Sequence, residues 1–313
     1  MEFGVQFFPN IKPEEKSSAQ YFDECLKLCE LLDVYGYTHV RTVEHYFHVY
    51  GGYSPNPIVF LTAASQRTNK ARLVTGAVLP VFNNPLKIAG EIGMLDGISN
   101  GRLEVGLARA FIPREFEAFK IDLGESVARF DEGVEQIAKL LEEENVTCKG
   151  RFHSFENITS FPRPLQKPRP QFWTAALSTE ESFEKAGRAG NWLMGIPIAG
   201  GKMKELLDIY RDAWKTAGHP GNGRIMLAFF MFCHEDHDEA IRIARTQVDN
   251  YFISLVDSAS GWTTGSASND YRNYDKILAS LKQENLDTQI EKCSAWVGTP
   301  EELVEMIKDY DNQ

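Results

Sequence analysis

The sequence is poor in cysteine and contains no C-x-x-C pair. Five cysteines are present among 313 residues: Cys25, Cys29, Cys148, Cys233 and Cys293. Their odd number and their spacing argue against a disulfide framework and against a thiolate zinc site. Cys25 and Cys29 are one helical turn apart in an apolar pattern, which favours two packed thiols over a redox pair. The sequence therefore predicts a protein of a reducing compartment, the cytoplasm.

Long hydrophobic runs and basic segments are also missing. No stretch reaches the roughly 18 consecutive apolar residues of a membrane span, and the first residues, MEFGVQFFPN, carry no basic leader. The formal net charge is -11 and the isoelectric point is near 5.2, which opposes binding to phosphate backbones and to anionic membranes. Neither nucleic acid nor a membrane is therefore an expected partner.

Several common catalytic motifs are absent as well. The chain has no dinucleotide-binding glycine motif, Walker loop, nucleophile elbow or H-E-x-x-H helix. It does have 43% hydrophobic and 12% aromatic residues, enough to bury the core of one large α/β domain.

Short β-branched or aromatic runs alternate with amphipathic stretches of helical length, which is typical of β/α units around a parallel sheet. The strand candidates are FGVQFF from Phe3, HVRTVE from His39, RLVTGAV from Arg72, RLEVGLA from Arg102, QFWTAAL from Gln171, WLMG from Trp192 and RIMLAFFMFC from Arg224. Helical spacing marks residues 17–35, 125–144, 202–217 and 236–249. The pattern predicts a single α/β domain over residues 1–313, a (β/α)8 barrel of the TIM type, with an open doubly wound sheet as the alternative.

Two parts of the chain break this rhythm. A Ser- and Gly-rich stretch from Asp257 to about Asp270 begins a predicted mobile insertion over residues 257–290, a candidate lid for the barrel mouth. VGTPEELVEMIKDYDNQ from Val297 has the pattern of a capped helix that should lead into an eighth strand, but the sequence ends there. The prediction is therefore a barrel without its last β/α unit, missing either from the fold or from the sequence.

Residues just after the strand candidates are the candidates for a site, because barrel active sites lie at the carboxyl ends of the strands. The loop EHYFHVYGGYSPNP places Glu44, His45 and His48 among aromatic residues. This suits a flat aromatic cofactor or, alternatively, a packed histidine on a surface loop. A metal site that includes His39 is a further alternative, although His39 and His45 fall at opposite ends of the strand.

An anion site is predicted after the fourth and fifth strands. Arg109 follows the fourth strand, where its guanidinium can bind a phosphate or form an ordinary ion pair. Ser178 or Thr179 caps the helix after the fifth strand, so that free N–H groups and hydroxyls point at one spot. Adjacent strands of one barrel would bring these groups together.

Taken together, these segments resemble the bacterial luciferase-like flavin monooxygenases over nearly the whole chain. The matching motifs are VEHYF and SPNP after the second strand, TGAVLP at the third, SNGRLEVGLARAF at the fourth, a P-x-P-x-F-W-T-A-A-L-S-T run at the fifth, and VGTPEE near the end. The resemblance implies a barrel that binds reduced FMN, which reacts with oxygen at C4a to give a peroxyflavin that oxygenates an organic substrate.

The resemblance also implies roles for residues near the second and third strands. His45 corresponds to the catalytic histidine, a general base or hydrogen-bond partner, with Glu44 as its orienting neighbour. Thr75 and Gly76 correspond to the place of a non-proline cis peptide beneath the flavin, where glycine leaves room for the ring. No metal is implied.

Arg109, Ser178 and Thr179 match the positions that hold the FMN phosphate in the family, in agreement with the anion site above. Two departures matter, because Tyr46 replaces a second histidine of luciferase and Ala108 replaces its reactive cysteine. Aldehyde oxidation with light emission is therefore not expected. Hydroxylation, N-oxidation or Baeyer-Villiger insertion is predicted instead.

Partners follow from the same resemblance: oxygen, a small-molecule substrate, a separate NAD(P)H-flavin reductase, and a second copy of the chain paired through the helices that flank the second and third strands. The alternatives are a non-catalytic flavin-binding protein related to the non-fluorescent flavoproteins, a deazaflavin-dependent oxidoreductase and a metal hydrolase. Phe7, Phe8, Phe111 and Trp173 indicate either an apolar substrate or core packing.

Overall fold

The structure, a computed structural model, describes residues 1–197, 202–264, 271 and 274–311. The chain divides into two compact units. The N-terminal unit comprises residues 2–175 and 266–272, and the C-terminal unit comprises residues 176–265 and 273–313.

The N-terminal unit is built on parallel strands that are neighbours in chain order. They are β1 (Gly4–Phe7), β2 (His39–Thr42), β3 (Arg72–Thr75), β4 (Leu103–Leu107) and β7 (Phe172–Ala175). β2 and β4 are buried along their whole length, as is typical of parallel strands covered on both faces. The register pairs Phe7 with Thr42 and Thr42 with Thr75, so the carboxyl ends of β1, β2 and β3 lie level. Loops that follow these strands therefore start at one edge of the sheet.

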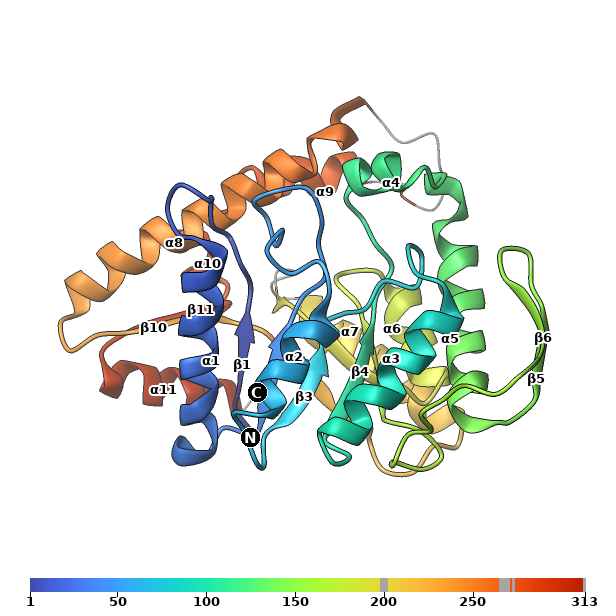
Figure 1. Ribbon diagram of the computed structural model, residues 1–313. Coiled ribbons are helices and arrows are strands. Elements are labelled where there is room, and N and C mark those ends of the chain that lie inside the picture. Colours follow the sequence, from blue (N-terminus) through green and yellow to red (C-terminus); the bar gives the residue numbers. More distant parts are fainter. Residues whose placement is uncertain (198–201, 265–270, 272–273, 312–313) are drawn as a thin grey trace. The chain divides into compact units, whose positions relative to one another are not determined.

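Helices pack side by side along this sheet (Figure 1): α1 (Ser18–Tyr35), α2 (Pro57–Ser65), α3 (Pro85–Ile98) and α5 (Ser126–Glu142). α1 begins after Ser17, whose hydroxyl accepts the Gln20 N–H, and ends at Gly36, where φ is 77°. α2 and α3 each begin after an asparagine cap, Asn56 or Asn84, that is followed directly by proline. These caps determine how many residues remain for the loop after β2 and the loop after β3.

Two shorter elements and a hairpin complete the N-terminal unit. α4 (Pro113–Phe119) and η1 (Leu123–Glu125) follow β4, and an antiparallel hairpin of β5 (Val146–Lys149) and β6 (Ser154–Ile158) follows α5. Glu132 on α5 holds the hairpin turn, because its carboxylate accepts the N–H groups of Arg151, Phe152 and His153. The sequence pattern did not predict this hairpin.

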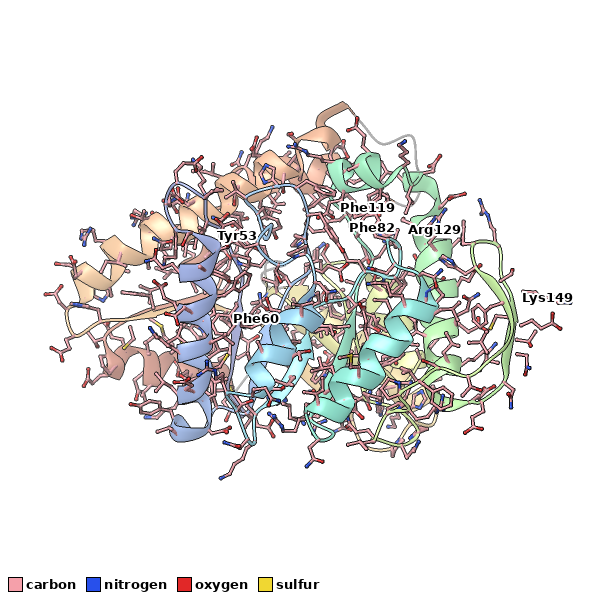
Figure 2. All side chains as sticks on the ribbon, in the orientation of Figure 1. Tyr53, Phe60, Phe82, Phe119, Arg129 and Lys149 are labelled. Carbon is pink, nitrogen blue, oxygen red and sulfur yellow. The ribbon has the colours of Figure 1, made fainter. Side chains whose placement is uncertain are left out.

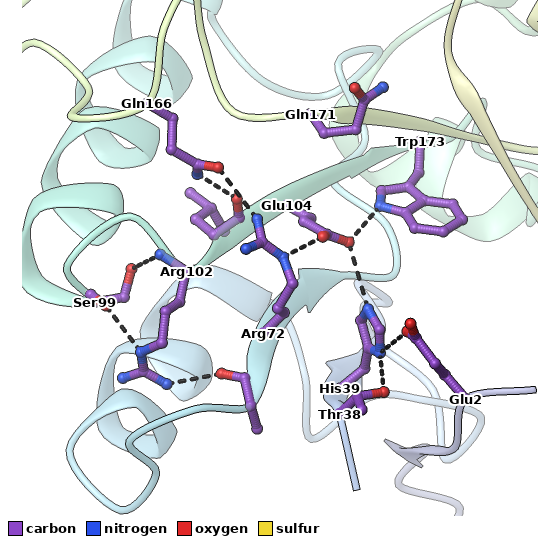
Figure 3. Close-up of polar contacts among 12 residues, drawn as sticks. Glu2, Thr38, His39, Arg72, Ser99, Arg102, Glu104, Gln166, Gln171 and Trp173 are labelled. Carbon is purple, nitrogen blue, oxygen red and sulfur yellow. Dashed lines mark hydrogen bonds and ion pairs between the residues drawn. The ribbon is translucent and has the colours of Figure 1, made fainter. Parts of the chain in front are cut away.

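Buried polar groups connect the strands near their amino ends (Figure 3). Glu104 on β4 is 1% exposed and forms an ion pair with Arg72 at the start of β3. Its other carboxylate oxygen accepts the indole N–H of Trp173 at 2.8 Å and lies 3.8 Å from His39 Nε2. For Trp173 the core alternative is therefore confirmed, because its side chain is buried and bonded to Glu104.

The C-terminal unit contains two pairs of parallel strands. β8 (Trp192–Gly195) pairs with β9 (Ile225–Leu227), and β10 (Phe230–Cys233) pairs with β11 (Ala295–Gly298). The helices among its described residues are α6 (Glu180–Arg188), α7 (Met203–Thr216), α8 (His237–Ser258), η3 (Ser260–Thr264), α9 (Tyr274–Leu281), α10 (Leu286–Glu291) and α11 (Pro300–Asp311). Phe183, Leu206, Tyr210 and Trp214 pack with Leu193 in a core of their own.

The helix predicted from Val297 is preceded by a strand that the sequence pattern did not predict. This strand, β11, pairs with β10 and leads into α11. β11 is difficult to recognise in the sequence because the strand is only four residues long and is followed at once by the Thr-Pro start of α11. The segment RIMLAFFMFC, read as one strand, is divided into β9 and β10.

The predicted insertion over residues 257–290 carries η3, α9 and α10, with residues 265–270 and 272–273 outside the described part of the chain. Its mobility stays a prediction, as does the single-domain organisation. The α/β fold with parallel strands is confirmed. Among the described helices, none combines the length and the apolar character needed to span a bilayer.

Candidate active site

His45 lies in the loop after β2, where its ring meets a carboxylate from a distant part of the chain. Nδ1 of His45 is 3.2 Å from Oε1 of Glu115, on α4. The same oxygen accepts the backbone N–H of Tyr46 at 2.9 Å. Glu115 is 0% exposed, whereas the His45 side chain is 12% exposed. One edge of the imidazole is thus held from inside the protein while part of the ring reaches the surface.

Glu44, the predicted orienting neighbour, has different contacts. Its carboxylate accepts the Tyr46 hydroxyl at 2.5 Å, the Asn83 amide at 2.9 Å and the Leu79 N–H at 3.2 Å. Burial raises the pKa of Glu44 to about 8, although these hydrogen bonds act in the opposite direction. Glu44 therefore ties the loop after β2 to the loop after β3, and the carboxylate that meets His45 is that of Glu115.

Aromatic rings and one glycine surround the His45 ring. Ring centroids of Tyr50, Phe8 and Phe111 lie 5.0, 5.9 and 6.0 Å from that of His45. Gly51 has a φ of 74°, and a Cβ at this position would lie 2.6 Å from His45 Cδ2. The sequence thus uses glycine where the backbone is left-handed and where the imidazole leaves no space for a side chain.

Two of the four aromatic residues that indicated either an apolar substrate or core packing are at His45. Phe8 and Phe111 are partly buried and flank the ring. Phe7 is buried and packs against Phe60 with centroids 5.4 Å apart, so it belongs to the core, as Trp173 does.

A second aromatic cluster joins the loops after β2 and β3 to α4. Figure 2 shows Phe82 and Phe119 next to each other, and their rings stack with centroids 4.8 Å apart. Tyr46 packs edge-on against Phe119 at 4.9 Å, and Phe116 packs against Phe82 at 5.0 Å. This cluster holds α4, and with it Glu115, against the loop that carries His45.

A non-proline cis peptide follows the third strand, next to the place that the sequence predicted. The cis bond is Gly76–Ala77, one bond beyond the Thr75–Gly76 pair to which the prediction was attached. Thr75 is fully buried, and its hydroxyl both donates to the Gly106 carbonyl and accepts the Gly106 N–H. A Cβ on Gly76 would collide with the Arg41 side chain. Thr75 and Gly76 thus join β3 to its neighbours.

Arg109 follows β4 and is partly exposed. Its guanidinium carbon lies 4.6 Å from the centroid of the Tyr271 ring, a cation–π geometry. The Tyr271 hydroxyl donates to the Ala110 carbonyl at 2.6 Å, and the Phe116 ring lies 6.0 Å away. Tyr271 therefore supports the loop from which Arg109 extends.

Ser178 and Thr179 belong to the C-terminal unit. Thr179 is the N-cap residue of α6, but its side chain makes no capping hydrogen bond; its hydroxyl is 2.7 Å from that of Ser182. The phosphate site predicted from Arg109, Ser178 and Thr179 draws on both units and stays a prediction.

The histidines considered for a metal site have separate surroundings. His39 lies beside Thr38 and Glu104, His45 beside Glu115, and His48 accepts the Tyr50 N–H. In the described ranges, no three His, Cys, Asp or Glu residues are grouped as metal ligands.

Comparison with known proteins gives consistent matches over the whole chain. The sequence model of the luciferase-like monooxygenases matches residues 1–313. The oxygenase component of the flavin-dependent trigonelline monooxygenase of Acinetobacter baylyi is 27% identical, over 95% of this chain and 82% of that protein. The crystal structure of the monooxygenase RslO1 from Streptomyces bottropensis superposes with a TM-score of 0.88 and 43% identity, over 100% of this chain and 89% of that one.

Two more distant structures share the fold. The oxygenating constituent of 3,6-diketocamphane monooxygenase from Pseudomonas putida, a type II Baeyer-Villiger monooxygenase in complex with FMN, is 21% identical with a TM-score of 0.79, over 99% and 88% of the two chains. An F420-dependent secondary alcohol dehydrogenase is 16% identical with a TM-score of 0.75, over 99% and 89%. The fold alone therefore serves both FMN and deazaflavin enzymes.

Proposed function

The chain belongs to the luciferase-like monooxygenase family, and we propose that it is an FMN-dependent oxygenase that uses reduced FMN and O2 to oxygenate a small organic molecule. The observation that carries this proposal is the imidazole of His45. Its Nδ1 atom contacts the carboxylate of the buried Glu115, and aromatic side chains surround the ring. A histidine in such a setting can accept or return a proton at a substrate that is itself kept from water.

The residues present fit a flavin mononucleotide. Phe8 and Phe111 offer apolar surface to a flat ring, and Arg109 provides a cation for the phosphate. When bound, reduced FMN supplies the electrons that activate O2 for insertion of one oxygen atom into the substrate. The protein would contribute binding, exclusion of water and the proton held at His45. Arg109 with Ser178 and Thr179 is the proposed phosphate site, and the backbone at Thr75 and Gly76 is proposed to face the flavin.

Reduced FMN has to come from a partner enzyme in this proposal, namely an NAD(P)H-flavin reductase. The trigonelline relative is itself called an oxygenase component, which supports a two-component system. All five cysteines are free, which fits a cytoplasmic enzyme. Burial raises the pKa of one of them, the Cys29 thiol, to about 12.

We also propose a homodimer. Large hydrophobic side chains are exposed on α1, α2 and α3, the helices that flank β2 and β3, and they include Leu31, Val34, Tyr35, Val59 and Met94. An apolar surface of this kind is typical of a protein–protein interface.

The test is an anaerobic titration of the protein with reduced FMN, followed by mixing with O2 while the flavin absorbance is recorded. We expect saturable binding and a course of flavin oxidation that differs from that of free reduced FMN. With a flavin reductase and NADH, a cell extract fraction that contains the substrate should yield a product heavier by one oxygen. Binding without any oxygenated product would favour a flavin carrier. Binding of reduced F420 in place of FMN would favour a deazaflavin oxidoreductase.

A further inference from the structure

Glu115 is a buried acidic residue, and the proposed function uses its contact with His45 without saying which ring nitrogen carries the proton. Its Oε1 atom carries both of its hydrogen bonds, one with His45 Nδ1 and one from the Tyr46 N–H. Its Oε2 atom is buried and makes no hydrogen bond within the described residues. Leaving a buried carboxylate oxygen unpaired costs free energy, and accepting one backbone N–H does not by itself require a charged side chain at this place.

The surroundings leave the imidazole little freedom to turn away from Glu115. A Cβ built on Gly51 would lie 2.6 Å from Cδ2 and 2.7 Å from Cβ of His45, and the rings of Tyr50 and Phe111 pack beside the imidazole. Glu115 is in the first turn of α4, which is held to the loop after β2 by the stacked aromatic cluster. The histidine and the carboxylate are thus fixed from two different β/α segments.

An ionised carboxylate can only accept a hydrogen bond, so the ring nitrogen that faces it would have to carry the proton. We propose that Glu115 is a positioning residue that keeps the proton of neutral His45 on Nδ1, so that Nε2 is the atom that accepts a proton during the reaction. This inference rests on the proposed function for its catalytic meaning, but the tautomer itself can be observed without any turnover.

The proton transfer balances without a further reactant. A substrate O–H bond breaks and an Nε2–H bond forms, so the substrate becomes an oxyanion and the ring becomes an imidazolium. The positive charge then lies beside the negative carboxylate of Glu115, whose Oε1 atom is 3.2 Å from Nδ1. A carboxylate placed in this way orients an imidazole and stabilises its cation without taking the proton itself.

The experiment uses the full chain labelled with 15N-histidine. Long-range 15N–1H spectra report which nitrogen of each of the seven histidines is protonated, and His45→Gln identifies the His45 signals. In the wild type we expect an Nδ1–H, Nε2-unprotonated ring. Glu115→Gln keeps the volume and an acceptor for Tyr46 but removes the charge, and it should shift His45 toward the Nε2–H form. Its kcat for oxygenation should fall about 100-fold, with FMN affinity unchanged.

Glu117→Gln is the matched control, because Glu117 is an exposed carboxylate on the same helix. It should leave the His45 signals as they are in the wild type. An Nε2–H tautomer in the wild type, or an unchanged tautomer in Glu115→Gln, would overturn the inference even if the protein oxygenates a substrate. Failure of the proposed function would show differently, as the expected tautomer in a protein that binds no reduced flavin.

Discussion

At the scale of single residues, the histidine was recognisable from the sequence and its carboxylate was not. VEHYF marks His45 through a motif of adjacent residues, whereas Glu115 reaches it from 70 positions away. The sequence pointed instead to the neighbouring Glu44, because no local pattern shows which of two carboxylates will turn toward a ring. Glu44 turns toward Tyr46, Asn83 and Leu79.

His45→Ala should lower oxygenation by roughly 100-fold while leaving FMN affinity close to that of the wild type. The reason is that the imidazole is proposed to move a proton, whereas Arg109 and the aromatic residues are proposed to bind the cofactor. Single-turnover product yield and flavin titration measure the two quantities separately. Turnover equal to that of the wild type would remove His45 from the mechanism.

Glu44→Gln should change how stability depends on pH. The pKa of Glu44 is about 8 in the folded protein and near 4.5 in the unfolded chain, so the folded state binds the proton more tightly. The stability that this proton provides is complete below about pH 4.5 and is lost as the pH rises toward about 8. In the variant this loss is absent, so its free energy of unfolding should rise relative to that of the wild type across this window.

Urea unfolding at about pH 5 and about pH 8 measures the free energy of unfolding of the variant and of the wild type at each pH. Glu117→Gln, an exposed carboxylate, serves as the control and should follow the wild type at both values. If the free energies of unfolding of Glu44→Gln and the wild type differ by the same amount at both pH values, the raised pKa of Glu44 would be contradicted.

At the scale of elements, the sequence predicted those parts whose periodicity spans several turns or strands. α1 begins one residue after the predicted limit, because Ser17 is its cap, and α5 agrees within two residues at each end. The hairpin of β5 and β6 escaped prediction because only β5 alternates between buried and exposed residues, while β6 has no fully buried residue. Its turn is fixed by a tertiary contact to Glu132.

Gly51→Ala tests the tight loop after β2. A side chain there would need a φ of 74° and would press on His45 Cδ2, so the variant should lose about 1–2 kcal/mol of stability and some oxygenation activity. Urea denaturation and product yield measure the two effects.

Gly97→Ala on α3 is the matched control. Its added Cβ meets nothing within 4 Å, and it should gain roughly 0.5–1 kcal/mol from helix propensity. Equal effects of the two substitutions would mean that the loop tolerates a side chain at position 51.

Arg109→Ala tests the loop after β4. The variant should bind FMN at least about tenfold more weakly, and riboflavin nearly as well as the wild type, because only FMN carries the phosphate. Fluorescence titration with the two flavins measures the ratio. A similar loss for both ligands would place Arg109 at the flavin ring or assign it a role in folding.

At the scale of the whole molecule, the α/β class and the order of strands and helices followed from the alternation of short apolar runs with amphipathic segments. The strand β11 did not, because it is four residues long and its neighbour β10 is far from it in the sequence. Long-range pairing of short strands leaves little trace in local composition.

The oligomeric state can be tested on the surface of α1, α2 and α3. Replacing Val59 and Met94 by glutamate places charges on an apolar surface, and these residues are 68% and 57% exposed in the single chain. We expect the wild type to elute as a dimer and the double variant as a folded monomer, measured by light scattering and circular dichroism. Unchanged mass in the variant would exclude this surface as the interface.

The aromatic contacts between α4 and the loop after β2 have a practical consequence for anyone who wishes to exchange parts among relatives. In a chimera that replaces only the segment after β2, the new loop would have to pack against Glu115, Phe82 and Phe119, which contact His45 and Tyr46 in this chain. Successful recombination should therefore require both segments from the same parent, so these two stretches of sequence form one inheritable unit.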